Sequence, residues 1–268
     1  VPSPVGVVVV PSSHTSDGTV RIVSLKFMAY NDPANGSNSP VAMAWGNYQT
    51  DLSLTNYTTL TTIVPGTTTT STNSYSYCAT NFHKYMYTEN TVDAGTHYCP
   101  YADDDDTYMP SPYAEDGSKS SVYHTAGRAM YDMNGASNTD TIISAVTAAW
   151  DGDTISNSSA AGNYPAACCC RRYAADAIDG LNDAYFGEGK WYLPSIGELG
   201  YLCARFEEID KGRKLAGAQS MWGSYVWSST ECSSGYAWRL GLPKDFNFGN
   251  VGYLNKGGGG SVLAFCSF

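Results

Sequence analysis

The segment of the chain that says most about its architecture is WYLPSIGEL, residues 191–199. Within it, Ser195 and Glu198 form the S-x-x-E pattern of a helix capping box, directly after Pro194. Apolar residues then recur at helical spacing, at Ile196, Leu199, Leu202, Cys203, Phe206 and Ile209. This pattern predicts a helix over residues 195–209 whose apolar face lies in the protein core.

A second helix is predicted upstream of this segment. Asn138, Thr139 and Asp140 are residue types that cap helix N-termini. Apolar residues follow on one helical face, at Ile142, Ile143, Val146, Ala149 and Trp150. The sequence therefore predicts two main helices, over residues 138–150 and 195–209.

β-Branched segments near the N-terminus predict a hairpin. Val5–Val10 and residues 20–30 read as two strands, separated by turn-forming residues at 16–18. Val262–Phe268 predicts a further strand, paired into the sheet.

The order of these elements predicts one α+β domain over residues 1–268. No clear linker separates them, and long irregular loops join them. The hairpin of residues 5–30 is expected to pack on a small antiparallel sheet. The chain lacks an initiator Met, which is expected of a processed product or an excised fragment.

Charge and hydropathy exclude several classes of partner. The net charge of −10 argues against nucleic acid and against an anionic membrane surface, because both demand a basic face. The longest apolar run, Val5–Val10, is too short to span a bilayer. We therefore expect no nucleic acid and no membrane insertion.

The sequence holds no recognisable catalytic or metal-binding motif. The eight cysteines include no C-x-x-C pair, and most are interpreted as small buried hydrophobes, with Cys168–Cys170 on alternating faces of a strand. The acidic run Asp103–Asp106 lacks the spacing of a calcium loop and is interpreted as a solvated loop. The four histidines lie outside any catalytic pattern, at His14, His83, His97 and His124. We expect no catalysis, no cofactor and no metal.

The segment after Gly217 has the composition of a binding surface. Gly, Asn and Ser alternate there with aromatic residues, among them Trp222, Tyr225, Trp227, Tyr236 and Trp238. Tyr and Trp offer large, rigid contact areas, while Ser, Gly and Asn offer adaptable hydrogen bonds. This composition favours ligand binding over a loop without a partner.

The same residues carry a resemblance to a known family. WYLPSIGEL resembles the helix-opening motif of C-type-lectin-like domains related to formylglycine-generating enzymes. Trp227–Glu231, then Ala237 and Trp238, and then residues 246–256, resemble the variable region of proteins that are diversified by retroelements. The segments Gly6–Pro11 and Ala166–Cys170 also resemble such proteins from gut bacteria and their phages.

The resemblance implies a variable region at about residues 222–268. It assigns exposed, ligand-binding side chains to Tyr225, Tyr236, Arg239, Asp245, Asn247, Phe248, Asn250, Tyr253, Leu254 and Asn255, on one surface. It assigns a fixed scaffold to Trp227, Trp238, Gly249, Val251 and Lys256. Gly252 and Gly257–Gly260 are expected at sites that could hold larger residues.

The resemblance also implies partners and a setting. The expected partner is a cell-surface receptor or another macromolecule, bound from the tip of a phage tail fibre or from a bacterial surface adhesin, with a homotrimer in the fibre case. The alternative is an oxidase of the formylglycine-generating type or another enzyme related in fold. That activity uses a cysteine pair, for which Cys232 and Cys266 are the candidates, although the surrounding pattern is missing.

Overall fold

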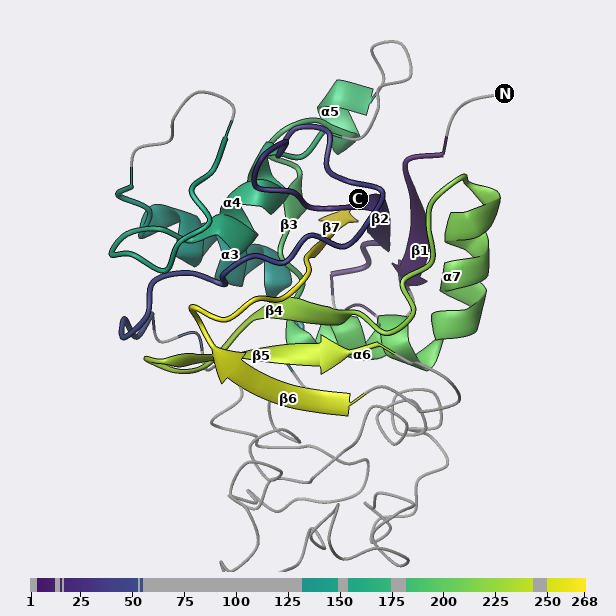
Figure 1. The fold of residues 1–268 in the computed structure, drawn as a ribbon. Helices are drawn as coiled ribbons and strands as arrows, with labels where there is room; N and C mark the ends of the chain where they lie inside the picture. The colour runs from purple at the N-terminus through teal and green to yellow at the C-terminus, as the bar shows by residue number, and fades with distance from the viewer. Residues whose placement is uncertain are drawn as a thin grey trace, which may run out of the picture.

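The computed structural model describes residues 4–12, 15, 17–52, 54, 132–148, 154–174, 182–242 and 250–268. They form an α+β structure with two small antiparallel sheets (Figure 1). Among the described residues, no helix has both the length and the apolar character needed to cross a membrane.

The first sheet has the strand order β1-β2-β7-β3 (Figure 1). Its strands are β1 (Gly6–Val10), β2 (Arg21–Phe27), β7 (Leu263–Ser267) and the short β3 (Trp191–Tyr192). Each neighbouring pair is antiparallel. The predicted hairpin and the pairing of the last strand into the sheet are therefore confirmed.

The second sheet has the order β4-β5-β6, again antiparallel. Its strands are β4 (Tyr225–Ser233), β5 (Tyr236–Gly241) and β6 (Asn250–Asn255). A parallel bridge joins Val226 of β4 to Ser261, two residues before β7 begins. The single small sheet expected from the sequence is thus two sheets, which the chain connects at this bridge.

The capping-box helix begins where the sequence predicts but is shorter. Helix α6 covers Ile196–Ala204, and both hydrogen bonds of the box between Ser195 and Glu198 are present. At Arg205 the backbone leaves helical geometry (φ −116°, ψ 27°), and α7 then covers Phe206–Leu215. The prediction of one helix over residues 195–209 is wrong in its continuity, because an apolar stripe reports a shared buried face and carries no signal for the break.

The helix predicted over residues 138–150 is displaced toward the N-terminus. Helix α3 covers Gly135–Ser144 and begins after Asn134, so the proposed capping residue Asn138 lies inside the helix, where it is buried. Its amide donates to Asp132 Oδ2 (2.8 Å). Residues 149 and 150, at the predicted helix end, lie outside the described residues.

The three consecutive cysteines lie in a helix, which corrects the predicted strand. Helix α4 covers Pro165–Arg172 and is followed by the short α5 (Asn182–Phe186). Pro165 takes the first helical position, where its missing N–H costs nothing. Cys168, Cys169 and Cys170 are all fully buried, which confirms that they are small buried hydrophobes. Burial raises the pKa of the Cys168 thiol to about 12.

Two hydrophobic clusters cover the sheets. One contains Val23 and Phe265 of the first sheet, the apolar face of α6, and Trp238 and Leu240 of the second sheet. The other contains Ile22 and Cys266 of the first sheet together with α4. The central strands β2 and β7 of the first sheet are therefore covered on both faces, and α6 also contacts β4 and β5.

Candidate ligand-binding surface

Two tryptophans of the predicted scaffold anchor the second sheet. Trp227 and Trp238 have no exposed surface. The Trp227 indole N–H donates to the carbonyl of Met43 (2.9 Å), and in return Trp45 donates to the carbonyl of Ser228 (2.7 Å). These reciprocal bonds fix β4 to the segment that follows the N-terminal hairpin.

A buried ion pair fixes the other side of this sheet. Lys256, directly after β6, contacts Glu231 of β4, and both side chains are fully buried. The Lys256 ammonium also donates to the carbonyl of Thr50 (2.6 Å), and burial lowers its pKa. The Glu231 carboxylate accepts the backbone N–H of Leu52 (3.0 Å) and of Leu54 (3.3 Å). Glu231 therefore has a structural role, and so has Lys256.

The segment between Trp227 and Glu231 also joins two helices. Thr230 donates its hydroxyl to Asp132 Oδ2 (2.7 Å) and accepts the N–H of Ile196 (3.0 Å) at the start of α6. Asp132 further accepts the N–H of Asn134 (2.9 Å), before α3, and burial raises its pKa. Sequence reasoning missed Asp132, since Thr230, through which it reaches the second sheet, is 98 positions away.

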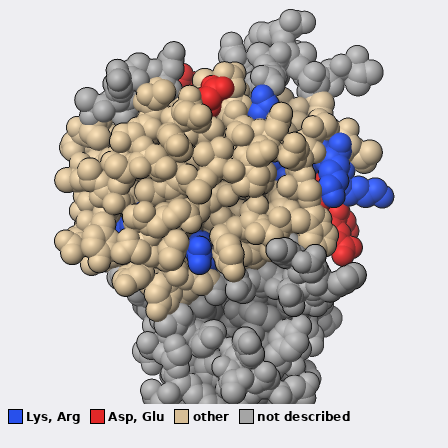
Figure 2. Space-filling model, viewed as in Figure 1, with Lys and Arg blue, Asp and Glu red and all other residues tan. Residues whose placement is uncertain are grey.

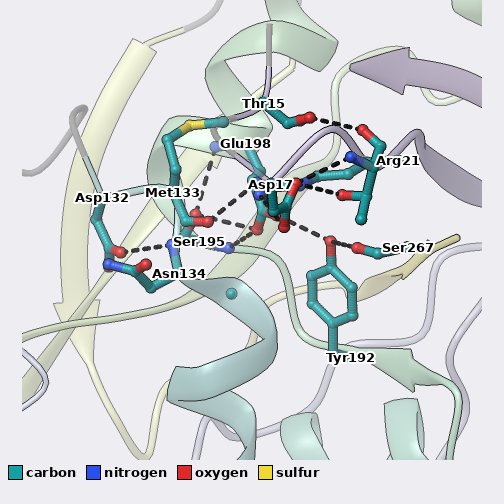
Figure 3. Close-up of polar contacts among 12 residues, drawn as sticks. Thr15, Asp17, Arg21, Asp132, Met133, Asn134, Tyr192, Ser195, Glu198 and Ser267 are labelled. Atoms are coloured by element: carbon teal, nitrogen blue, oxygen red, sulfur yellow. Dashed lines mark hydrogen bonds and ion pairs between the residues drawn. The ribbon is translucent and has the colours of Figure 1, made fainter. Parts of the chain in front are cut away.

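Glu198 belongs to a second polar network, which Figure 3 shows. Its carboxylate pairs with the Arg21 guanidinium (2.6 Å) of β2 and accepts the Tyr192 hydroxyl (2.9 Å) of β3. The Tyr192 hydroxyl also lies 2.9 Å from the Ser267 hydroxyl of β7. Burial raises the pKa of Glu198 although Arg21 opposes the shift. This network ties α6 to three strands of the first sheet and leaves Glu198 no free role as an acid.

Three tyrosine side chains of the second sheet are exposed. Tyr225, Tyr236 and Tyr253 are 46%, 41% and 37% exposed. Because side chains alternate along a strand, the pairing register decides which of them share a face. Tyr236 pairs with Asn255, while Tyr225 pairs with Gly241.

One group, here named the tyrosine patch, comprises Tyr236, Tyr253 and Asn255. The Tyr236 and Tyr253 rings meet edge to face at 5.3 Å, and Tyr253 meets the buried Trp238 in the same way at 5.7 Å. Asn255 lies opposite Tyr236, and its side-chain oxygen accepts the N–H of Gly257 (2.8 Å). The exposed Tyr253 ring is thus supported directly by a core side chain, and Tyr253 in turn contacts Tyr236.

The other group, the arginine patch, comprises Tyr225, Arg239 and Gly252 on the opposite face. The Arg239 guanidinium carbon lies 4.2 Å from the centre of the Tyr225 ring. Gly252 pairs with Arg239, and a Cβ added at Gly252 would meet no atom within 4 Å. This confirms that the site of Gly252 has room for a larger residue.

The expectation of one continuous surface therefore needs correction. The predicted residues that are described lie on two faces of one sheet, since Tyr236 and Arg239 are an odd number of residues apart in β5. Leu254 pairs with Ala237 and is partly buried against the core. Asn250 begins β6 opposite Gly241. Three predicted ligand-binding residues and one scaffold glycine lie outside the described residues: Asp245, Asn247, Phe248 and Gly249.

The terminal glycines differ in the space around them. A Cβ at Gly260 would lie 2.6 Å from Trp227 Nε1, and one at Gly258 would lie 2.5 Å from a methyl carbon of Leu254. At Gly259 the nearest atom is the Ala42 methyl, at 3.4 Å. The expectation of free space holds at Gly259. It is wrong at Gly260, where the buried indole fills the space, and also at Gly258 and at Gly257, where a Cβ would lie 2.9 Å from the Ser159 hydroxyl.

The two cysteines of the oxidase alternative lie in different sheets. Cys232 is in β4 and Cys266 is in β7. Burial raises the pKa of each thiol to about 11, which disfavours the nucleophilic thiolate. Within the described part of the chain, no group of three or more His, Cys, Asp or Glu side chains is placed to hold a metal ion. Of the predicted sites named above, His14, His83, His97, His124 and Asp103–Asp106 lie outside the described residues.

Comparison with known proteins gives no relative: no protein-family model, no curated protein and no solved structure matches this chain.

Proposed function

We propose that the protein is a non-enzymatic binding protein with a C-type-lectin-like fold, which recognises a cell-surface receptor through the second sheet. The observation that carries the proposal is the separation of exposed and buried side chains along β4 and β5. Tyr225, Tyr236 and Arg239 reach solvent, while Trp227 and Trp238 between them are fully buried.

This separation has an energetic consequence. A surface can change its side chains freely when those side chains do not pack the core, because core truncations cost several times more stability than surface substitutions. Trp227, Trp238, Glu231 and Lys256 provide the packing and the buried polar contacts of this sheet. The exposed residues are then available for recognition, as a retroelement-diversified binding face requires.

Aromatic residues are the expected anchors of such a surface. Exposed tyrosines bury a large apolar area on binding at low cost in side-chain entropy. The tyrosine patch presents two rings in contact with each other, and the Tyr253 ring also packs against the buried Trp238. We place the protein at a phage tail-fibre tip or on a bacterial surface. In the fibre case it is a homotrimer. Sedimentation analysis at high protein concentration tests this, and a mass of the monomer alone would contradict it.

The proposal is tested with the double variant Tyr236→Ala/Tyr253→Ala. The probe is a panel of intact gut-bacterial strains, to which fluorescently labelled protein binds and is counted by flow cytometry. We expect wild-type protein to bind at least one strain and the double variant to lose that binding by about tenfold or more, the usual effect of removing a central aromatic anchor.

The matched control is Tyr185→Ala. Tyr185 is 58% exposed on α5, outside the second sheet, so the change removes an exposed ring without altering either patch. The control is expected to bind as wild type does. Equal loss in both variants, or loss accompanied by a lower melting temperature of the double variant, contradicts the assignment.

A further inference from the structure

Arg239 is held in position by an aromatic ring. It is partly buried on β5, and its guanidinium carbon lies 4.2 Å from the centre of the Tyr225 ring. Such stacking restricts a long side chain and leaves its N–H groups free to donate in the plane of the guanidinium. Tyr225 itself remains 46% exposed, so the stacked pair reaches solvent.

An open space lies beside this pair. Arg239 has the buried Trp227 on one neighbouring strand and Gly252 on the other. Tyr225 likewise faces Gly241 across the strands. Gly241 is buried, but Gly252 is only partly buried, and a Cβ at Gly252 would meet no atom within 4 Å. The space suits a ligand group that approaches the backbone closely.

Arg239 differs from the other described arginines in its partners. Arg21, Arg171, Arg172 and Arg205 each pair with a carboxylate, and Arg213 donates to backbone carbonyls. Within the described ranges, Arg239 has neither kind of contact. Burial lowers the pKa of Arg239, so the guanidinium bears a desolvation cost that an anionic ligand would offset.

We propose that Tyr225, Arg239 and Gly252 form a recognition site for the carboxylate of an acidic sugar. The proposal rests on the proposed function, because Tyr225 and Arg239 belong to the second sheet, through which recognition is proposed, and it adds the class of ligand. The guanidinium holds the carboxylate by two parallel hydrogen bonds, while the bare strand at Gly252 admits the sugar ring.

The charge of the protein favours a sugar over an acidic peptide. The chain carries a net charge of −10, so a ligand with many carboxylates is repelled at long range. Figure 2 shows one face on which most described residues are neither acidic nor basic. The single guanidinium of the arginine patch matches one carboxylate on a largely uncharged ligand.

The test uses two acidic probes and their neutral counterparts. Galacturonic acid, which has one carboxylate, is compared with its methyl ester, and sialyllactose with lactose, by titration calorimetry at low salt. We expect at least one acidic probe to bind and its neutral counterpart to bind about tenfold more weakly or not at all, since a charge-assisted hydrogen bond is lost.

Three variants locate the site. Arg239→Gln is expected to abolish the preference for the acid, Arg239→Lys to retain part of it because the ammonium lacks the planar fork, and Gly252→Leu to block binding while keeping the charge. The matched control is Arg205→Gln, which removes one positive charge from the start of α7 and is expected to bind as wild type does. If Arg239→Gln lowers the melting temperature, the binding of the acidic probe by Gly252→Leu decides whether the site is the proposed one.

Several outcomes overturn the inference. They are equal binding of acid and neutral probe, binding of neither acidic probe, and unchanged binding by Gly252→Leu. Arg239-dependent binding of a triglutamate peptide, without binding of the sugars, assigns the site to a protein ligand instead. If tyrosine-dependent cell binding persists without sugar binding, this inference alone fails. Sugar binding without tyrosine-dependent cell binding contradicts the proposed role of the tyrosine patch alone.

Discussion

The two sheets of the protein differ in how their faces are covered. In the first sheet, consecutive residues such as Ile22 and Val23 point into separate hydrophobic clusters, so neither face reaches solvent there. In the second sheet, each face carries both solvent-reachable and fully buried residues. Tyr236 is exposed beside the buried Trp238 on one face, and Arg239 is partly exposed beside the buried Ala237 on the other. In the first sheet an exposed apolar side chain is confined to the outer strand β1, at Val8, whereas the second sheet combines buried residues with exposed aromatic ones on both outer strands and on β5.

The largest expected effect tests whether those buried residues carry the stability of the second sheet. Trp238→Ala removes a fully buried indole from the cluster that also contains Leu240 and α6. We expect a loss of about 3–5 kcal/mol in the free energy of unfolding, measured by urea denaturation. Tyr225→Ala removes an exposed ring and should lower the free energy of unfolding by less than about 1 kcal/mol. Similar losses of stability from both changes would contradict the distinction between buried scaffold residues and replaceable exposed residues.

The next effect concerns the ion pair beneath the surface. Lys256→Met leaves the buried Glu231 carboxylate without its counter-ion, and we expect a cost of about 3–5 kcal/mol. Adding Glu231→Gln should recover part of that loss, since the uncompensated charge is removed. The measurement is a double-mutant cycle on the free energy of unfolding. Additive losses would show that the two side chains act independently.

The smallest effect compares two glycines near the same sheet. Gly260→Ala introduces a methyl group 2.6 Å from the Trp227 indole nitrogen, and overpacking of this kind costs about 1–3 kcal/mol. Gly252→Ala enters open space, where the result should lie between no change and a gain of about 1 kcal/mol. Thermal unfolding of the two variants measures the difference. Equal melting temperatures would place both glycines among the replaceable positions.

The sequence predicted best what depends on neighbouring residues. The capping box is correct because Ser195 and Glu198 satisfy each other's backbone within one turn. Helix α4 was missed because three cysteines fit a strand as well as a helix, and the signal that could have decided was Pro165 at the first helical position. The break at Arg205 had no local signal, since the apolar stripe continues through Phe206.

The candidate site was predicted in composition but not in arrangement. Trp227, Trp238 and Lys256 are buried as expected of a scaffold. The division of the exposed residues between two faces follows from strand alternation, which needs the bounds of β5 before it can be applied. The pairing of Arg21 with Glu198 joins residues 177 positions apart, and no pattern within one segment reports such a contact.

The position of β7 has a consequence for synthesis of the protein. It lies between β2 and β3, and the N–H of Ala264 bonds to the Ser24 hydroxyl across 240 residues. At a translation rate of about 5–20 residues per second, roughly 10–50 s pass before this neighbour of β2 leaves the ribosome. Until then the nascent hairpin presents an unpaired strand edge, the feature most prone to pairing with other chains. Because β7 follows β2 by more than 230 residues, the edge of β2 that β7 covers stays unpaired until β7 itself has been translated.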